Sequence, residues 1–205
     1  MQGELAYARA DYATAEQYFR QALDETDSDT LIRRSYLSLA ETYRDGGAVI
    51  KDANAREIEL LEGACSLVQL QGNPVLYEML GAAQYNAKAY SAAAESFETV
   101  LSLGVQKPYL FVNAFTARQA AGQYDKAEAV LDQMEQAYPD DYTPNALRST
   151  LWIMEQNKKA QSARNYRPAY EQYQLAKSKV TSSDETTQLQ QLEGLIAQLK
   201  SGGWL

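Results

Sequence analysis

Two consecutive stretches, NPVLYEMLGAAQYNAKAYSAAAESFETVLSLGVQ (73–106) and KPYLFVNAFTARQAAGQYDKAEAVLDQMEQAYPDD (107–141), have the same order of small, aromatic and polar residues. Their landmark residues recur 34 residues apart, as the pairs Tyr90 and Tyr124, Ala93 and Ala127, and Phe97 and Leu131. Self-similarity at a period of this length is the sequence signature of a repeat architecture.

The landmarks have a physical basis in the packing of paired helices. A pair of antiparallel helices cannot bury its apolar stripe alone, so neighbouring pairs must stack. Gly81 and Ala93 are expected where two helices cross closely, because a larger side chain would separate them. Phe97 and Leu131 are expected to fill the space toward the next repeat. Gly122 is expected in a turn, where a left-handed backbone conformation is easily adopted by glycine.

The pattern resembles the tetratricopeptide repeat, in which an aromatic residue, Leu-Gly, Tyr, Ala, Phe and Pro follow one another. Leu80-Gly81 matches the Leu-Gly pair in the first copy, Ala114-Phe115 stands there in the second, and the Pro is present only as Pro139. The resemblance implies an all-α fold, a right-handed solenoid of antiparallel helix pairs, which forms one domain over residues 1–205.

We expect five repeats and a C-terminal capping helix. Their approximate bounds are 1–28, 29–72, 73–107, 108–142 and 143–181 for the repeats and 182–201 for the capping helix. The first repeat is truncated, which favours a chain cut from a longer protein, with a short native cap as the alternative. Ser182-Ser-Asp-Glu185 has the pattern of a capping box that opens the last helix. Leu189, Leu192, Leu195, Ile196 and Leu199 are expected on one face of that helix.

The charge of the chain bears on its partners. With 27 acidic and 19 basic residues the net charge is −8, which argues against nucleic acid as a ligand because phosphate binding needs a basic surface. Residues 1–141 carry 22 acidic and 11 basic side chains, a net charge of −11, and residues 142–205 carry 5 and 8, a net charge of +3. This imbalance keeps head-to-tail self-association as an alternative.

Several residue types that serve in catalysis are scarce or missing. There is no histidine, which removes the commonest general base and metal ligand. The single cysteine, Cys65, excludes an intramolecular disulfide and is expected to be a small buried apolar residue. We therefore expect no enzymatic activity, no cofactor and no metal. The first ten residues do not resemble a signal peptide and no apolar run is long enough to span a bilayer, which favours the cytoplasm.

Two short motifs have an ordinary structural explanation. Asp27-Ser-Asp29 lacks the glycine and the distal glutamate of a calcium loop, so we expect it to cap a helix. Gly46-Gly47 is not followed by the Gly-Lys-Ser/Thr of a phosphate loop, so we expect a flexible turn.

In tetratricopeptide proteins the first helix of each repeat lines the concave face, and the resemblance therefore implies a binding groove there. The expected groove residues are Arg34, Glu41, Glu78, Tyr85, Asn86, Tyr109, Asn113, Thr116, Gln119, Asn145, Arg148 and Trp152. Tyr and Trp supply rigid contact area, and Asn and Gln can bind the backbone of an extended peptide.

One subgroup of the family grips a C-terminal carboxylate with Lys, Asn and Arg at set positions of three successive first helices. Asn113 stands at one such position, but Glu78 and Ala82 stand where Lys and Asn are needed. The sequence therefore does not predict that clamp. It predicts an interaction scaffold that binds a peptide or a partner protein in the groove. The alternatives are a regulatory or assembly domain of a larger signalling protein or enzyme, and a self-associating assembly factor.

Overall fold

The computed structural model describes residues 2–181 and 183–205, with the side chains of 183–188 left out. Within these residues every regular element is a helix, which confirms the all-α expectation. The elements are α1 (Gln2–Ala8), α2 (Tyr12–Glu25), α3 (Asp29–Asp45), α4 (Ala53–Ser66), α5 (Pro74–Asn86), α6 (Tyr90–Ser102), α7 (Pro108–Ala120), α8 (Tyr124–Ala137), α9 (Thr143–Lys158), the short 3-10 helix η1 (Gln161–Ala163), α10 (Arg167–Lys179) and α11 (Ser183–Ser201).

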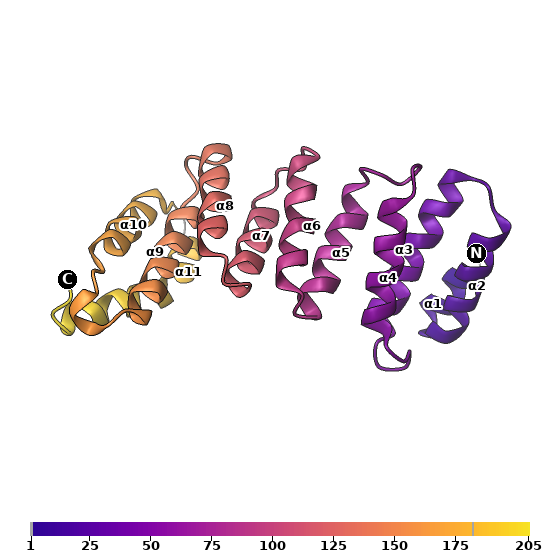
Figure 1. Cartoon of the computed structure of the whole chain (residues 1–205), viewed down its shortest axis with the longest axis horizontal. Helices are drawn as coiled ribbons and strands as arrows, with labels where there is room; N and C mark the ends of the chain where they lie inside the picture. The colour runs from indigo at the N-terminus through magenta and orange to yellow at the C-terminus, as the bar shows by residue number, and fades with distance from the viewer. Residues whose placement is uncertain (1, 182) are drawn as a thin grey trace. The chain divides into compact units, whose positions relative to one another are not determined.

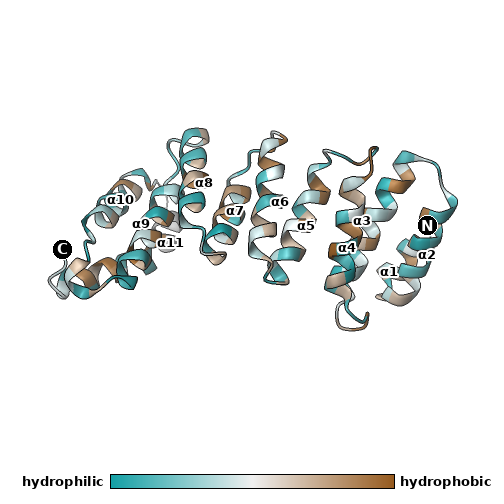
Figure 2. Ribbon diagram, in the orientation of Figure 1, coloured by the Kyte–Doolittle hydropathy of each residue, from teal (hydrophilic) through white to brown (hydrophobic). Residues whose placement is uncertain are grey.

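The chain divides into two compact units, Met1–Ala117 and Arg118–Leu205. Within each unit, successive helices run antiparallel and pack as hairpins (Figure 1). Hydrophobic and hydrophilic residues share each helix instead of separating into apolar and polar helices (Figure 2). Each helix therefore needs its neighbours to cover its apolar side. A single domain over 1–205 stays a prediction.

The close helix crossings of the first unit depend on glycine. A Cβ atom added to Gly81 would lie 2.9 Å from Cε1 of Phe97, so a larger residue would push α5 away from α6. The same contact occurs between α1 and α2, where a Cβ on Gly3 would lie 2.8 Å from Cε1 of Phe19. Ala93 is fully buried, as expected. The landmarks inferred from the sequence are thus confirmed as packing positions.

The turns between paired helices require a left-handed residue. Gly122 has a φ of 72°, as predicted. The equivalent positions of two earlier repeats hold Ala10, with a φ of 58°, and Lys88, with a φ of 62°. A side chain in this conformation is strained, so these two turns carry a local cost that Gly122 avoids.

The helix ends agree only in part with the sequence patterns. Asn73 caps α5 by accepting a hydrogen bond from the Val75 N–H at 3.1 Å, and Gly46 ends α3. The expected capping by Asp27 and Asp29 is not seen: Ser28 is the N-cap of α3 and its side chain makes no capping bond. These residues are exposed, so the free N–H groups of the first turn are open to solvent.

The core of the second unit joins α9, α10 and α11. Leu189, Leu192 and Ile196 of α11 are buried against it. Leu195 is 39% exposed, which corrects its assignment to the same face, because that face is narrower than the leucine pattern indicates. The capping box at 182–185 lies outside the described residues and side chains.

The structure also bears on the environment of Cys65, on membrane-spanning helices and on metal-binding groups. Cys65 is 9% exposed, and burial raises the pKa of its thiol to about 11, which confirms it as a buried packing residue. No helix among the described residues has both the length and the apolar character to cross a bilayer. In the same part of the chain, no set of three or more Cys, Asp or Glu side chains is placed to hold a metal ion.

Candidate functional site

Four of the expected groove residues lie together in the first unit. Tyr85 and Asn86 at the end of α5 and Asn113 and Thr116 on α7 line a hollow of about 240 Å³. Its other lining residues are apolar: Ala82 and Phe97. The positions 82, 85 and 86 share a face of α5, and 113 and 116 share a face of α7, because residues three and four apart are neighbours on a helix.

The polar groups around this hollow are largely free. The side chains of Asn86 and Asn113 make no hydrogen bond within the described part of the chain, and Asn86 is exposed. The hydroxyl of Thr116 donates to the carbonyl of Val112 at 2.7 Å, so its oxygen can still accept. An exposed carboxamide offers both donors and an acceptor, which is the pattern that a peptide group complements.

The apolar floor of the hollow is placed by the glycine crossing. Phe97 comes from α6 and reaches the hollow because Gly81 leaves no side chain in its path. Its ring is 3% exposed, so only a small part faces the hollow. Gly81 thus contributes to the site through the position of Phe97.

One turn closer to the N-termini of α5 and α7, two more expected groove residues are bonded to each other. The Tyr109 hydroxyl donates to Oε1 of Glu78 at 3.0 Å. Burial and this bond to a carboxylate raise the pKa of Tyr109. Tyr109 remains 43% exposed, so the pair offers a carboxylate and an aromatic surface next to the hollow.

The remaining expected residues on α3 and α7 lie outside the hollow. The exposed Arg34 forms an ion pair with Glu4, and Glu41 is half-buried. In the second unit, Gln119 is half-buried and its Nε2 lies 3.5 Å from Sδ of Met154.

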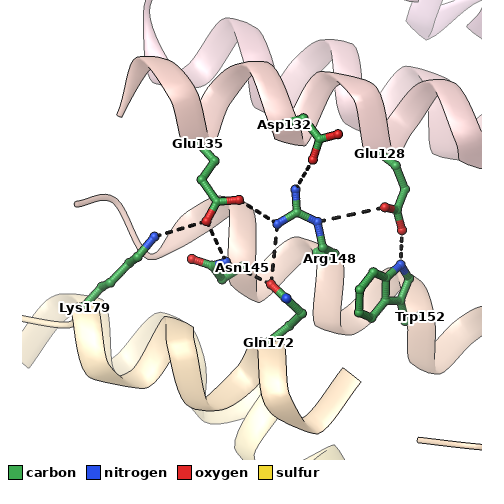
Figure 3. A network of polar contacts seen from close by, with 8 residues as sticks. All are labelled: Glu128, Asp132, Glu135, Asn145, Arg148, Trp152, Gln172 and Lys179. Carbon is green, nitrogen blue, oxygen red and sulfur yellow. Dashed lines mark hydrogen bonds and ion pairs between the residues drawn. The ribbon is translucent and has the colours of Figure 1, made fainter. Parts of the chain in front are cut away.

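The three expected residues on α9 are engaged inside the second unit (Figure 3). Asn145 is 1% and Arg148 5% exposed, which corrects the expectation that their side chains are free to contact a partner. Trp152 is half-buried and its indole N–H donates to Glu128. The first helix of a repeat also packs on the preceding second helix, and these side chains point to that side.

Arg148 is surrounded by carboxylates from α8. One terminal nitrogen lies 2.6 Å from Oδ1 of Asp132 and the other 2.9 Å from Oε2 of Glu135, while Nε is 4.0 Å from Oε2 of Glu128 (Figure 3). The Asn145 amide donates to Glu135 at 3.1 Å and to Gln172 of α10 at 2.9 Å. This cluster therefore connects α8, α9 and α10.

The pKa values of the carboxylates in this cluster reflect burial, which raises them, and contacts with Arg148, which lower them. Burial raises the pKa of Glu128, although the Arg148 charge opposes the shift. Burial acts in the same direction on Glu135, but hydrogen bonds from Arg148 and Asn145 outweigh it and lower the pKa of Glu135. The sequence contained a signal for this cluster, since 128, 132 and 135 form one acidic stripe at helical spacing.

Comparison with known proteins was made at the level of sequence and of fold. No family model and no curated protein matches the chain. A crystal structure of MamA protein is 17% identical, with 87% of each chain covered and a TM-score of 0.62. A structure of MamA from Desulfovibrio magneticus RS-1 (41-end) is 12% identical, covers 86% of this chain and 89% of that one, and has a TM-score of 0.56.

A third structure, TTC0263, a thermophilic TPR protein of Thermus thermophilus, is 17% identical over 91% of this chain and 92% of that one, at a TM-score of 0.46. The chain combines antiparallel helix pairs, a 34-residue period and glycine crossings, and the match to MamA covers most of its length. The fold is of the tetratricopeptide-repeat type. Folds of this type stack their repeats so that they present extended concave surfaces.

Proposed function

We propose that this tetratricopeptide-type protein binds a peptide or a partner protein at the hollow between α5 and α7. The observation that carries the proposal is the pair of free carboxamides, Asn86 and Asn113, over an apolar floor. A few polar groups at the rim of an apolar depression are typical of a recognition site.

The chemistry of the hollow indicates how a peptide would bind. The Asn86 and Asn113 amides pair with a backbone N–H and C=O of an extended segment, as strand-like ligands require. An apolar side chain of the ligand enters against Phe97 and Ala82. Tyr109 adds a rigid aromatic surface one turn away, and Glu78 favours a ligand with a basic residue there. Arg34 and Glu41, on α3 of the same unit, belong to the proposal as flanking contacts.

A random-peptide library displayed on phage tests this function. We expect peptides enriched on the wild-type protein to lose about tenfold or more in affinity for Asn86→Ala/Asn113→Ala, because two hydrogen-bonding groups are removed. The control is Asn54→Ala, which removes a carboxamide elsewhere in the first unit. Equal affinity of the double variant and the control would exclude the hollow as the site.

Self-association is the second candidate, and the charge imbalance favours it. The net charges of −11 for residues 1–141 and +3 for residues 142–205 attract copies head to tail. Light scattering in low salt is expected to give a mass above the monomer value of 22.9 kDa that returns to it in high salt. A monomer mass at every salt concentration rules this candidate out.

A further inference from the structure

The second unit contains a separate cleft that none of the expected groove residues lines. It has a volume of about 1010 Å³ and lies between α10 and the end of α11, where it is lined by the last turn of α11 and by the residues that follow it. Tyr170 and Leu175 form one wall, and Lys200 and Trp204 the other. Leu175 is 48% exposed there.

The wall that carries Trp204 is rigidly built. The Trp204 backbone N–H donates to the Leu199 carbonyl at 2.9 Å, and the Gly203 backbone N–H donates to the Lys200 carbonyl at 3.1 Å. This pair of hydrogen bonds is the Schellman ending of a helix. Gly203 has the left-handed φ of 74° that this ending needs. The Trp204 ring also meets Tyr166 edge-on, with centroids 5.5 Å apart. The indole is therefore in position before a ligand arrives.

The rim of the cleft supplies positive charge and free donors. The Lys200 ammonium donates to the Tyr170 hydroxyl at 3.0 Å and lowers the pKa of that hydroxyl, and its other two N–H groups have no partner in the described residues. The Arg167 side chain is 82% exposed and uses only Nε, 3.4 Å from Oε1 of Glu171. The indole N–H of Trp204 likewise has no acceptor within the described part of the chain.

We propose that this cleft binds a peptide segment in which a carboxylate side chain stands next to a large apolar side chain. The carboxylate contacts Lys200 and Arg167, and the apolar side chain packs against Leu175 and the Trp204 ring. Among the described lining side chains, Arg167 and Lys200 are basic and Glu171 is acidic, which leaves a net charge of +1. The local charge is thus complementary to an acidic ligand.

Both parts of the ligand are required by the composition of the cleft. A purely apolar peptide would bury the cations without a counter-charge, which is unfavourable. A purely acidic peptide would leave Leu175 and the indole ring in contact with water and would lose the contribution of apolar burial. A peptide with both kinds of side chain gives the cations a counter-charge and covers the apolar surface. Hydrogen bonds from Lys200 and Arg167 to a carboxylate are charge-assisted and therefore stronger than hydrogen bonds between neutral groups.

This site is independent of the function proposed above, because it shares no residue with the hollow between α5 and α7. Three blocked pentapeptides test it by calorimetric titration of the full chain: acetyl-EFELE-amide, acetyl-QFQLQ-amide and acetyl-KFKLK-amide. We expect the acidic peptide to bind about tenfold or more tightly than the neutral one, the size of one charge-assisted hydrogen bond. The basic peptide is expected not to bind at this cleft, and any heat that it gives by binding at the hollow near Glu78 is expected to be lost in Asn86→Ala/Asn113→Ala.

Nuclear magnetic resonance locates the binding. The chain has two tryptophans, so its spectrum has two indole N–H peaks, and Trp204→Phe identifies the one that belongs to Trp204. The acidic peptide is expected to shift the Trp204 peak and to leave the Trp152 peak, whose N–H is bonded to Glu128, nearly unchanged. Shifts confined to Trp152 would overturn the proposal.

Two variants separate the charge from the apolar contact. Arg167→Gln/Lys200→Gln and Leu175→Asp each alter exposed side chains, and each is expected to weaken the acidic peptide about tenfold or more. Lys126→Gln on α8, an exposed lysine outside the cleft, is expected to leave its affinity unchanged. Equal affinity for the acidic and neutral peptides, no binding of the acidic peptide, or undiminished binding by both cleft variants would each overturn the proposal.

Discussion

Arg148 shows how one buried charge organises the second unit. Its guanidinium is removed from water but bonded to Asp132 and Glu135, and Lys179 of α10 approaches Glu135 within 3.5 Å. Burial of an ion is unfavourable unless partners compensate, so removal of one partner leaves the others uncompensated. The cluster therefore links α8, α9 and α10 through one buried cation.

Arg148→Met is expected to lower the free energy of unfolding by about 3 kcal/mol, because Glu128 and Asp132 lose their counter-ion and Glu135 retains only Lys179. Urea denaturation followed by circular dichroism measures it. Arg167→Met is the control, since the Arg167 side chain is 82% exposed and surface ion pairs contribute little. A similar midpoint for both variants would contradict the structural role of Arg148.

Glu57 is a buried acid at a packing position of α4. It is 4% exposed, and burial raises its pKa to about 7, although the nearby Arg44 opposes the shift. Between the unfolded value of about 4.5 and about 7 the folded state holds a proton that the unfolded state has lost. The contribution of Glu57 to stability therefore falls as the pH rises through this window.

Glu57→Gln removes this dependence. Relative to the wild type, the free energy of unfolding of the variant is expected to increase as the pH rises from 4.5 to 7.5. Urea denaturation of both proteins at three pH values checks the sign. Parallel pH dependences would show that Glu57 is ionised in the folded protein.

Helix hairpins in this chain share one turn geometry that the sequence fills in different ways. The left-handed position holds Gly122 in one hairpin and Ala10 and Lys88 in two others. The left-handed φ of this turn residue is thus set by how the two helices meet. The residue type determines only how much strain the left-handed conformation causes. Glycine relieves the clash between Cβ and the carbonyl oxygen that a side chain meets there.

Lys88→Gly is expected to raise the free energy of unfolding by about 1 kcal/mol, because it removes a side chain from a left-handed residue. Gly122→Ala is the converse change and is expected to lower it by a similar amount. Thermal unfolding of the two variants and of the wild type tests these two opposite changes in stability. A loss of stability in Lys88→Gly would mean that the Lys88 side chain makes a contact that outweighs the strain.

For the whole molecule, the open question is whether the units Met1–Ala117 and Arg118–Leu205 unfold together. Stacked repeats stabilise one another through nearest-neighbour interfaces, so a defect in one repeat spreads along a cooperative array. The prediction of one domain over 1–205 therefore has a thermodynamic consequence. Both tryptophans, Trp152 and Trp204, report on the second unit alone.

Phe97→Ala tests this cooperativity, because it empties a buried position in the first unit. The substitution is expected to lower the free energy of unfolding by about 3–5 kcal/mol. It is also expected to lower the unfolding midpoint measured by tryptophan fluorescence as well as that measured by circular dichroism. A fluorescence midpoint equal to that of the wild type would show that the second unit unfolds on its own.

The sequence by itself determined the helix pairs, their 34-residue period and the small residues at the crossings. These features are local or strictly repeated, since a helix is encoded by its own residues and a crossing by the size of one side chain. The helix-face argument also placed Asn113 and Thr116 together, and Tyr85 and Asn86 together.

Only the tertiary structure decided which polar side chains remain free. Asn145 and Arg148 lie on the first helix of their repeat, as Asn113 does, yet they are buried because acidic residues of α8 and Gln172 of α10 surround them. The cleft at Trp204 likewise depends on how the end of α11 folds back toward Tyr166. Such contacts join residues that do not recur with the repeat period. Whether each side chain is buried and bonded or remains exposed is therefore determined by its neighbours in space.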